Sequence, residues 1–293
     1  MGRSISLIVN PSAGGGRAAR ALPKVQNRLS ALGVTFHTET TRDFAHARDL
    51  AVAAARGGEI AVTLSGDGLV GCVAGALRGV DGAVLGVLPG GRGNDFARVA
   101  GIPLDPEAAC DVIAHGIERP LDVGEAGDGA TFIGIASLGF DSVANRIANE
   151  APGQLGKLVY LYGALRAVAG WRPATFEVEV DGERHAFSGW SVAAANSKAY
   201  GGGMFLAPEA ELDDGALDVV LSARTGKLRF LWSLPKVFKG THVHEPSVTV
   251  LRGREVRVSA DRPFTVYADG DPIGELPIVL RAVPHALKVL MPA

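Results

Sequence analysis

The chain has 293 residues, of which 47% are hydrophobic and 20% charged, a composition typical of a globular protein with a large core. A formal net charge of −2 gives no overall basic field, which excludes bulk nucleic-acid binding. The two cysteines, Cys72 and Cys110, form no CxxC pattern, so a zinc site or disulfide framework is excluded in favour of two small core residues.

The first 120 residues alternate between strand-like and helix-like patterns. Strands are predicted at residues 4–10, 34–40, 59–64 and 83–89, and helices at 17–33, 43–58, after Gly68, and at 94–101 and 105–116. Asp43 is the expected N-cap of the second helix. Strand–helix alternation with short loops predicts a parallel sheet covered on both faces.

After Pro120 the pattern changes. Residues 175–196 read as two strands joined at Asp181-Gly182, a strong hairpin signal. Further short strands are predicted at 216–223, 246–251, 255–260, 264–270 and 275–282, and helices at 156–170 and 227–240. We therefore expect an α/β protein with a parallel-sheet domain at 1–120 and a mainly antiparallel domain at 121–280. Residues 281–293 are candidates to return to the first domain.

Three glycine-rich stretches follow strands of the first domain: NPSAGGGR (10–17), SGDG (65–68) and PGGRGND (89–95). Glycine lets bare backbone N–H groups approach an anion, and a following helix adds partial positive charge at its N-terminus. Ligands bind such sheets beyond the carboxyl ends of the strands. Three such loops at one edge predict a polyphosphate site, although neither the P-loop ending nor a GxGxxG fingerprint is present.

Asp67 is unusual within a phosphate-binding turn, because a carboxylate repels phosphate unless a cation or proton intervenes. Two interpretations stay open from the residues alone. Asp67 either serves as a turn or N-cap residue, or faces a metal ion or the acceptor hydroxyl.

The stretches SGDGL and LPGGRGNDFARVAGIP (88–103) resemble the diacylglycerol kinase catalytic domain, whose family includes bacterial lipid kinases and the sphingosine and ceramide kinases. NPSAGGGR resembles the opening motif of that family. YGGGMFLAPEAELDDGALDVV (200–220) and DGDPIG (269–274) resemble its later motifs. The resemblance implies a nucleotide-binding α/β domain like that of NAD and diacylglycerol kinases and a C-terminal β-sandwich. ATP would lie in the cleft between them.

The resemblance also implies site residues. The nucleotide site would comprise Asn10, Arg17, Thr41, Ser65, Gly66, Asp67, Gly68, Leu69, Gly91, Arg92, Asn94 and Asp95. The catalytic carboxylates would be Asp67, Asp269 and Asp271, with Asp271 as the proton acceptor at an ordinary pKa of about 4. Glu211, Asp214 and the backbone carbonyl of Ala216 match a structural Mg²⁺ site of bacterial members. DGDPIG, taken by itself, is also a hairpin-turn sequence.

The sequence departs from the family pattern at several of these positions. Leu69 replaces a threonine, as in sphingosine and ceramide kinases, and Gly71-Cys72 replaces an Asn-Glu pair. Arg92 stands where a phosphate-binding threonine is usual and offers a charged fork instead of one hydroxyl. Asp271 replaces a glutamate that is one methylene longer.

The leading hypothesis is an ATP- and Mg²⁺-dependent kinase of a diacylglycerol-like or sphingoid lipid. The alternatives are a kinase of a soluble hydroxyl substrate, as in NAD kinases, and a non-catalytic nucleotide- or lipid-binding relative. No apolar stretch reaches the roughly twenty residues of a bilayer span, so we expect a cytoplasmic protein with transient peripheral membrane contact. Residues 156–172 and 226–240 have the composition of interfacial helices, with ordinary packed helices as the alternative. A homodimer is compatible with the sequence.

Overall fold

The computed structural model describes residues 3–127, 129–150 and 159–293. The chain divides into two compact units, the first comprising residues 1–123 and 285–293 and the second residues 124–284. No helix in the described ranges is both long and apolar enough to cross a membrane.

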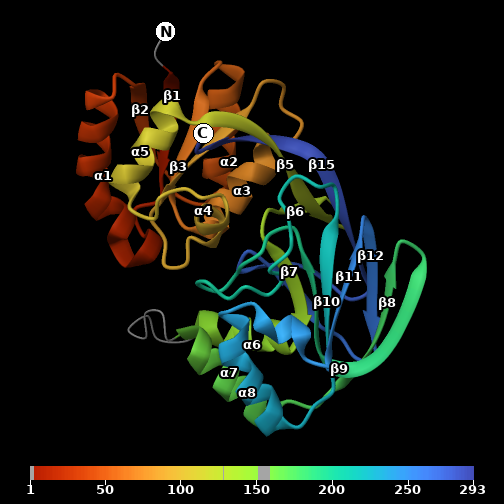
Figure 1. Cartoon of the computed structure of the whole chain (residues 1–293). Coiled ribbons are helices and arrows are strands. Elements are labelled where there is room, and N and C mark those ends of the chain that lie inside the picture. Colours follow the sequence, from red (N-terminus) through yellow and green to blue (C-terminus); the bar gives the residue numbers. More distant parts are fainter. Residues whose placement is uncertain (1–2, 128, 151–158) are drawn as a thin grey trace. The chain divides into compact units, whose positions relative to one another are not determined.

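The first unit is a parallel α/β structure (Figure 1). Its strands lie in the order β15-β4-β3-β1-β2, and the pairings between neighbours are parallel. Its elements are β1 (Ser4–Val9), α1 (Ala13–Ala31), β2 (Thr35–Thr40), α2 (Phe44–Arg56), β3 (Ile60–Ser65), α3 (Asp67–Leu77), β4 (Val84–Pro89), α4 (Asp95–Val99), α5 (Pro106–His115) and the end of β15 (Ile278–Met291). The predicted parallel sheet is confirmed.

Helices cover both faces of this sheet. α1 packs against α5 on one face, and α2 packs against α3 on the other (Figure 1). Asp43 caps α2 as predicted, because its carboxylate accepts a hydrogen bond from the backbone N–H of His46 at 2.7 Å. Asp105 caps α5 in the same way through Ala108 at 3.2 Å. The caps fix where each helix begins, and so how long each preceding loop can be.

The second unit is mainly antiparallel. Its elements are the end of β5 (Ile117–Ala126), β6 (Ala130–Phe132), β7 (Ile135–Gly139), α6 (Phe140–Glu150), α7 (Val159–Gly170), β8 (Ala174–Val180), β9 (Glu183–Ala195), β10 (Leu217–Ala223), α8 (Lys227–Val237), a 3-10 turn (Thr241–His244), β11 (Val248–Gly253), β12 (Glu255–Ala260), β13 (Thr265–Ala268), β14 (Asp271–Glu275) and most of β15. Strands β14-β13-β7-β9-β8-β12-β15 are neighbours in that order, and β10 pairs with β9 and β11. The predicted fold class, a parallel α/β domain with an antiparallel β-sandwich domain, is confirmed.

Several predicted elements differ in detail. The hairpin at Asp181-Gly182 is present, with both residues at positive φ, as a two-residue turn of this kind requires. The helix predicted at 156–170 is described from Val159 onward, and residues 156–158 lie outside the described residues. The strand predicted at 264–270 is shorter, because Asp269 and Gly270 form a turn. Helix α6 was not predicted.

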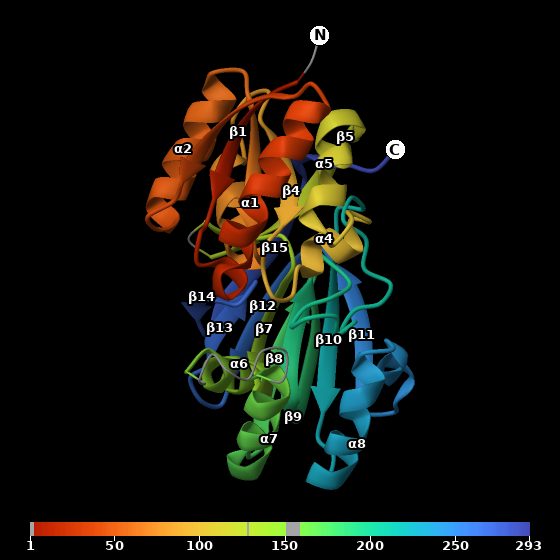
Figure 2. The same ribbon diagram turned by 90° about the vertical axis from the view of Figure 1, so that its left-hand side faces the viewer.

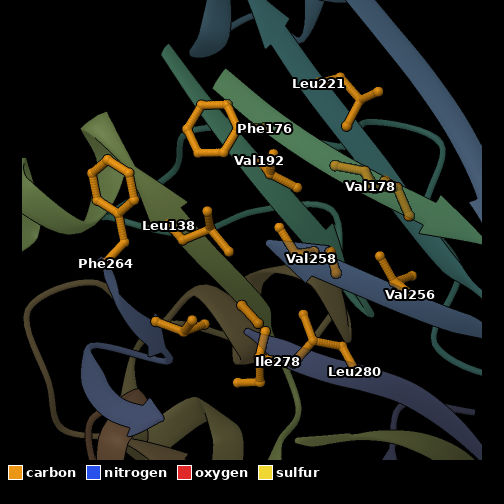
Figure 3. Close-up of a cluster of buried hydrophobic side chains, with 14 of the residues drawn as sticks. Leu138, Phe176, Val178, Val192, Leu221, Val256, Val258, Phe264, Ile278 and Leu280 are labelled. Carbon is orange, nitrogen blue, oxygen red and sulfur yellow. The ribbon is translucent and has the colours of Figure 1, made fainter. Parts of the chain in front are cut away.

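The core of the second unit is a continuous apolar cluster between its strands and helices (Figure 3). Leu138, Phe176, Val192 and Val258 are almost fully buried within it. Trp190 is 1% exposed and stacks on Phe230 of α8, with ring centroids 3.8 Å apart. Aromatic pairs of this kind add to area burial, so α8 is held to the sheet by its inner face.

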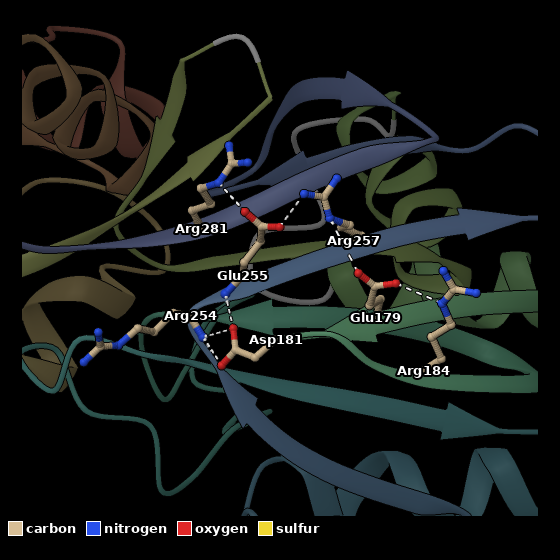
Figure 4. A network of polar contacts seen from close by, with 7 residues as sticks. All are labelled: Glu179, Asp181, Arg184, Arg254, Glu255, Arg257 and Arg281. Atoms are coloured by element: carbon tan, nitrogen blue, oxygen red, sulfur yellow. Dashed lines mark hydrogen bonds and ion pairs between the residues drawn. The ribbon is translucent and has the colours of Figure 1, made fainter.

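An ion-pair network crosses the strands of the second unit (Figure 4). Glu255 on β12 bonds Arg281 at 2.7 Å and Arg257 at 2.6 Å, and Glu179 on β8 bonds Arg184 at 3.0 Å. These pairs are exposed, and pairs of that kind each contribute little stability. Glu255–Arg257 lies within β12, whereas Glu255–Arg281 joins β12 to β15 and Glu179–Arg184 joins β8 to β9, so the last two pairs support the register of those strands.

Candidate active site

The three glycine-rich loops meet at the carboxyl ends of the adjacent strands β1, β3 and β4. A Cβ atom added to Gly14 would lie 2.5 Å from the carbonyl oxygen of Gly90. A Cβ atom added to Gly91 would lie 2.4 Å from the Cα of Gly66. Both distances are far inside van der Waals contact, so the three backbones touch only because these positions carry no side chain.

The first loop combines a side-chain turn with a left-handed glycine run. The Asn10 side-chain oxygen accepts hydrogen bonds from the Ser12 backbone N–H at 3.1 Å and from its hydroxyl at 2.8 Å. Gly14, Gly15 and Gly16 then have φ values of 60°, 68° and 82°, a conformation that only glycine adopts repeatedly. Arg17 donates to the carbonyl of Gly91 at 3.4 Å. The Asn10 side chain thus fixes the turn of the first loop, and the Arg17 side chain joins the first loop to the third loop.

The second loop leads into α3 with an open helix N-terminus. Gly66 occupies the N-cap position, and no side chain caps the helix there. The first bond of the helix runs from Val70 N–H to the Gly66 carbonyl at 3.2 Å. The backbone N–H groups of Gly68 and Leu69 therefore precede the intrahelical ladder and are available to an anion. Because the Leu69 side chain is buried, it can contribute to such a site only through its backbone.

Ser65 and Thr41 are buried beneath these loops. The carbonyl of Ser65 accepts a hydrogen bond from Gly90 N–H at 2.6 Å, which ties the second loop to the third. The Thr41 hydroxyl donates to the carbonyl of Val9 at 3.2 Å. In this arrangement Thr41 supports the end of β1, and its hydroxyl is already engaged.

The third loop is held by Asn94. This residue has a left-handed φ of 53°, and its side chain accepts from Gly91 N–H at 2.8 Å and donates to the Gly91 carbonyl at 3.2 Å. Arg92 lies between these anchored positions and is exposed. Asp95 is buried, 3.7 Å from the guanidinium of Arg98. Among the predicted residues of this loop, Arg92 is the one whose side chain projects to solvent.

Asp67 performs a local structural role in addition to any role toward substrate. Its Oδ1 accepts a hydrogen bond of 3.1 Å from the backbone N–H of Phe96, in the first turn of α4. Asp67 is therefore not an N-cap residue, because Gly66 holds that position in α3 and Asn94 holds it in α4. The carboxylate fixes the third loop against α3.

Asp269 and Asp271 occupy the β13–β14 hairpin of the second unit. Asp269 and Gly270 have φ values of 52° and 98°, so this stretch is a hairpin turn. Asp269 accepts from the backbone N–H of Ile133 at 2.9 Å and thereby anchors the chain before β7. Asp271 is exposed, yet surrounding atoms partly desolvate its carboxyl and raise its pKa above the ordinary value. The expectation of an ordinary pKa for Asp271 is wrong for this reason.

The predicted metal ligands lie in a loop of the second unit, where an arginine side chain is paired with one of them. Asp214 accepts a hydrogen bond from Ala216 N–H at 3.0 Å through Oδ1, and its Oδ2 is paired with the Arg252 guanidinium. Glu211 is exposed. No group of three or more His, Cys, Asp or Glu side chains in the described part of the chain is placed to hold a metal ion. Both oxygens of Asp214 thus accept hydrogen bonds within the chain, and the Mg²⁺ site at Glu211, Asp214 and Ala216 stays a prediction.

Sequence reasoning missed a buried carboxylate in the second unit. Asp141, at the start of α6, bonds Ser191 and has its pKa raised to about 7 by burial. It lines a cavity of about 70 Å³ together with Trp190, Tyr200 and Phe230. Burial also raises the pKa of Tyr200. Strongly shifted groups in an apolar cavity mark candidate functional positions. The available signal was a carboxylate two residues after the end of the buried strand β7.

The first unit is a parallel sheet with glycine loops at the carboxyl ends of its strands, and the second unit is mainly antiparallel. A family model described as the diacylglycerol kinase catalytic domain matches residues 4–126. A second model, the YegS C-terminal NAD kinase beta sandwich-like domain, matches residues 134–291. The chain belongs to the diacylglycerol kinase catalytic domain family.

Relatives with a named activity align with this chain over nearly its full length. A diacylglycerol kinase of Mycobacterium tuberculosis is 34% identical and covers 98% of this chain and 95% of its own. A probable lipid kinase YegS-like protein of Pseudomonas aeruginosa is 32% identical, over 94% of this chain and 89% of its own. The crystal structure of a diacylglycerol kinase from Bacillus anthracis superposes with a TM-score of 0.76 at 20% identity, covering 99% of this chain and 97% of that one, and shows the shared fold. This protein is a lipid kinase.

Proposed function

We propose that this lipid kinase transfers the γ-phosphoryl group of ATP, supplied as its magnesium complex, to a hydroxyl of a diacylglycerol-like or sphingoid lipid. The observation that carries the proposal is the contact among the three glycine loops. Backbone amides meet at one edge of the sheet through Gly14, Gly66 and Gly91, and helix α3 begins at the same edge. That combination suits the polyphosphate of a nucleotide.

Each group of the first unit has a distinct role in this proposal. The N–H groups of Gly68 and Leu69 receive phosphate oxygens, and the exposed Arg92 adds a charged fork. The Asp67 carboxylate faces the metal ion of the nucleotide or the acceptor, while one of its oxygens holds Phe96. Magnesium bound with the nucleotide supplies charge neutralisation of the phosphates.

The second unit supplies the base. Asp271 takes the proton of the acceptor hydroxyl as the bond to phosphorus forms, so the proton passes to its carboxylate and ADP leaves. A raised pKa brings Asp271 closer to the working pH and makes it a better proton acceptor than an ordinary aspartate. Asp269 places the turn by anchoring it to Ile133.

Acceptor class is tested by direct assay. The purified chain is incubated with ATP labelled at the γ-phosphate and with separate pools of diacylglycerol, sphingoid base, ceramide and NAD. The proposal is supported if the wild type and the Asp81→Asn variant transfer label to a lipid product and the Asp67→Asn variant does not. Asp81 is an exposed carboxylate in a turn of the same unit and serves as the matched control. Label in NAD alone, or in no acceptor, would overturn it.

A further inference from the structure

Helix α8 (Lys227–Val237) carries apolar side chains on both its inner and its outer face. The inner face packs on the sheet through Phe230, which stacks on Trp190. On the outer side Leu228 is 75% exposed, Trp232 is 79% exposed, and Phe238, directly after the helix, is 53% exposed. Large apolar side chains on the outer side of a packed helix are normally covered, so these three are unusual in the isolated chain.

Basic residues surround this outer face. Residues 224–239 contain five Lys or Arg side chains (Arg224, Lys227, Arg229, Lys236 and Lys239) and no Asp or Glu. Leu228, Trp232 and Lys239 are four and then seven residues apart, which places them on one side of a helix and its extension. Glu245 pairs with Arg229 and Lys236, and Asp141 lies at the cavity on the inner side of the helix. The face therefore keeps a positive excess.

We propose that the outer face of α8, defined by Leu228, Trp232 and Phe238 with Lys227, Lys236 and Lys239, docks on the surface of an anionic lipid bilayer. The apolar side chains would enter the boundary between headgroups and acyl chains, and the ammonium groups would meet lipid phosphates. Tryptophan suits such a boundary because its large ring is apolar and its N–H is polar. The inference rests on the proposed function for its lipid occupant, since a lipid acceptor resides in a bilayer.

Charge argues against a second copy of the chain as the occupant. A symmetric contact through α8 would bring two sets of like-charged Lys and Arg side chains together. An anionic bilayer instead offers opposite charge along the whole face. Lys227 is also fixed in place, because its ammonium donates to the carbonyl of Ala169 at 2.8 Å and so joins the start of α8 to the end of α7. Figure 2 shows both helices at the same end of the second unit.

The chain contains its own reporter for this contact. Of its three tryptophans, Trp171 and Trp190 are 6% and 1% exposed, and only Trp232 faces water. Vesicles of phosphatidylcholine, alone or with phosphatidylglycerol, are titrated into the full chain while tryptophan emission and quenching by iodide are followed. Docking should shift the emission to shorter wavelength and protect Trp232 from iodide with the anionic vesicles, and added salt should weaken the effect.

Sedimentation with the same vesicles measures binding of the variants. Leu228→Ser/Trp232→Ser should weaken binding about tenfold or more, and Lys239→Glu severalfold, because each removes part of the interfacial contact. Leu104→Ser, which changes a 42%-exposed leucine elsewhere, and Lys24→Glu should leave binding unchanged. Equal binding of the double variant and the wild type would overturn the proposal. So would a wild-type dimer in lipid-free solution that the double variant dissociates.

Activity separates this inference from the proposed function. With a short-chain diacylglycerol dispersed in solution, Leu228→Ser/Trp232→Ser should turn over at the wild-type rate, whereas with vesicle-borne acceptor it should be slower by about its loss of binding. Vesicle binding without turnover on either acceptor would refute the proposed function and leave docking supported. Equal loss on both acceptors would refute docking as the cause.

Discussion

The backbone N–H of Phe96 donates a 3.1 Å hydrogen bond to Oδ1 of Asp67. This bond joins the start of α3 to the start of α4 and so fixes the position of the third glycine loop. Asp67 therefore has two separable properties. Its oxygen holds the loop, and its negative charge is available for the reaction.

The substitution Asp67→Asn separates these properties. The asparagine side chain retains an oxygen that accepts from Phe96, so the melting temperature should stay close to that of the wild type. The charge is lost, and kcat should fall by about 10²-fold or more if the carboxylate faces the metal ion or the acceptor, as electrostatic groups at active sites do. Steady-state kinetics with lipid and ATP, together with a thermal melt, measure both effects.

Asp67→Ala is the matched comparison, because it removes oxygen and charge together. It should lose about 1.5–3 kcal/mol of stability, the usual value of a hydrogen bond to a charged group, in addition to activity. An Asp67→Asn variant with near-normal turnover and an unchanged melt would contradict the catalytic assignment.

A second prediction concerns the contact between Gly91 and Gly66. Gly91→Ala would place a methyl group 2.4 Å from the Gly66 Cα and 2.8 Å from the Asn94 side-chain oxygen. The second and third loops must then separate, so the KM for ATP should rise at least tenfold and the protein should lose roughly 1–3 kcal/mol of stability. Kinetics at varied ATP and urea denaturation test this.

Gly57→Ala is the control for that change. A Cβ there would lie 3.4 Å from its nearest neighbours, an ordinary contact, and the position is at a helix end in the same unit. It should leave KM unchanged. Equal effects of the two substitutions would mean that loop contact is not what sets ATP affinity.

The features that could be predicted from the sequence are those that depend on residues close together in the chain. Alternation of apolar strands and capped helices gave the parallel sheet, and Asp181-Gly182 gave a hairpin, because each depends on nearby residues. The three loops could be placed at one edge from the parallel strand order. Their mutual contact through Gly14, Gly66 and Gly91 depends on loop conformation, which periodicity does not contain.

Other features depended on tertiary contacts that no local pattern encodes. The bond from Phe96 to Asp67 joins residues 29 positions apart, and Arg252 reaches Asp214 across 38. The contact between Arg252 and Asp214 adds an ion pair to a stretch that resembles a metal site. Likewise, the burial of Asp141 depends on what β9 and α8 place around it.

The third prediction concerns Arg92, the exposed cation of the third loop. If its guanidinium contacts a phosphate, Arg92→Ala should weaken ATP binding by about 1.5–3 kcal/mol, or roughly 10- to 150-fold. The KM for ATP should rise more than kcat falls. Arg92→Lys should recover part of the affinity, because it keeps the charge but loses the planar fork. Arg56→Ala, an exposed arginine at the end of α2, is the control. An unchanged ATP affinity would place Arg92 in solvent.

The fourth prediction follows from the pKa of Asp141, which burial raises from 3.8 to about 7. The folded state favours the protonated carboxyl of Asp141. The contribution of this group to the free energy of unfolding is therefore complete below about pH 4, declines as the pH rises, and is lost above about pH 7. An asparagine side chain cannot ionise and avoids this loss. The stability gain of Asp141→Asn should therefore be about 2–3 kcal/mol larger at pH 8 than at pH 5. Urea denaturation at both values measures it, and an equal gain at both would show that Asp141 is already ionised at pH 5.

The last prediction assigns the general base to Asp271. Asp271 is the first residue of β14 and is opposite Ala268 in the hairpin, and partial desolvation of its carboxyl raises its pKa. General bases contribute about 10²–10⁴-fold, so Asp271→Asn should lower kcat by that order with little change in the KM for ATP. Because a base must be ionised, wild-type activity should fall as the pH drops through the raised pKa, at a higher pH than an ordinary aspartate would give. Asp271→Glu should retain that acid limb and substantial activity, whereas the exposed Asp213→Asn should behave as wild type. If Asp271→Asn turns over normally with the same acid limb, the proton passes to another group, and Asp67 becomes the first candidate.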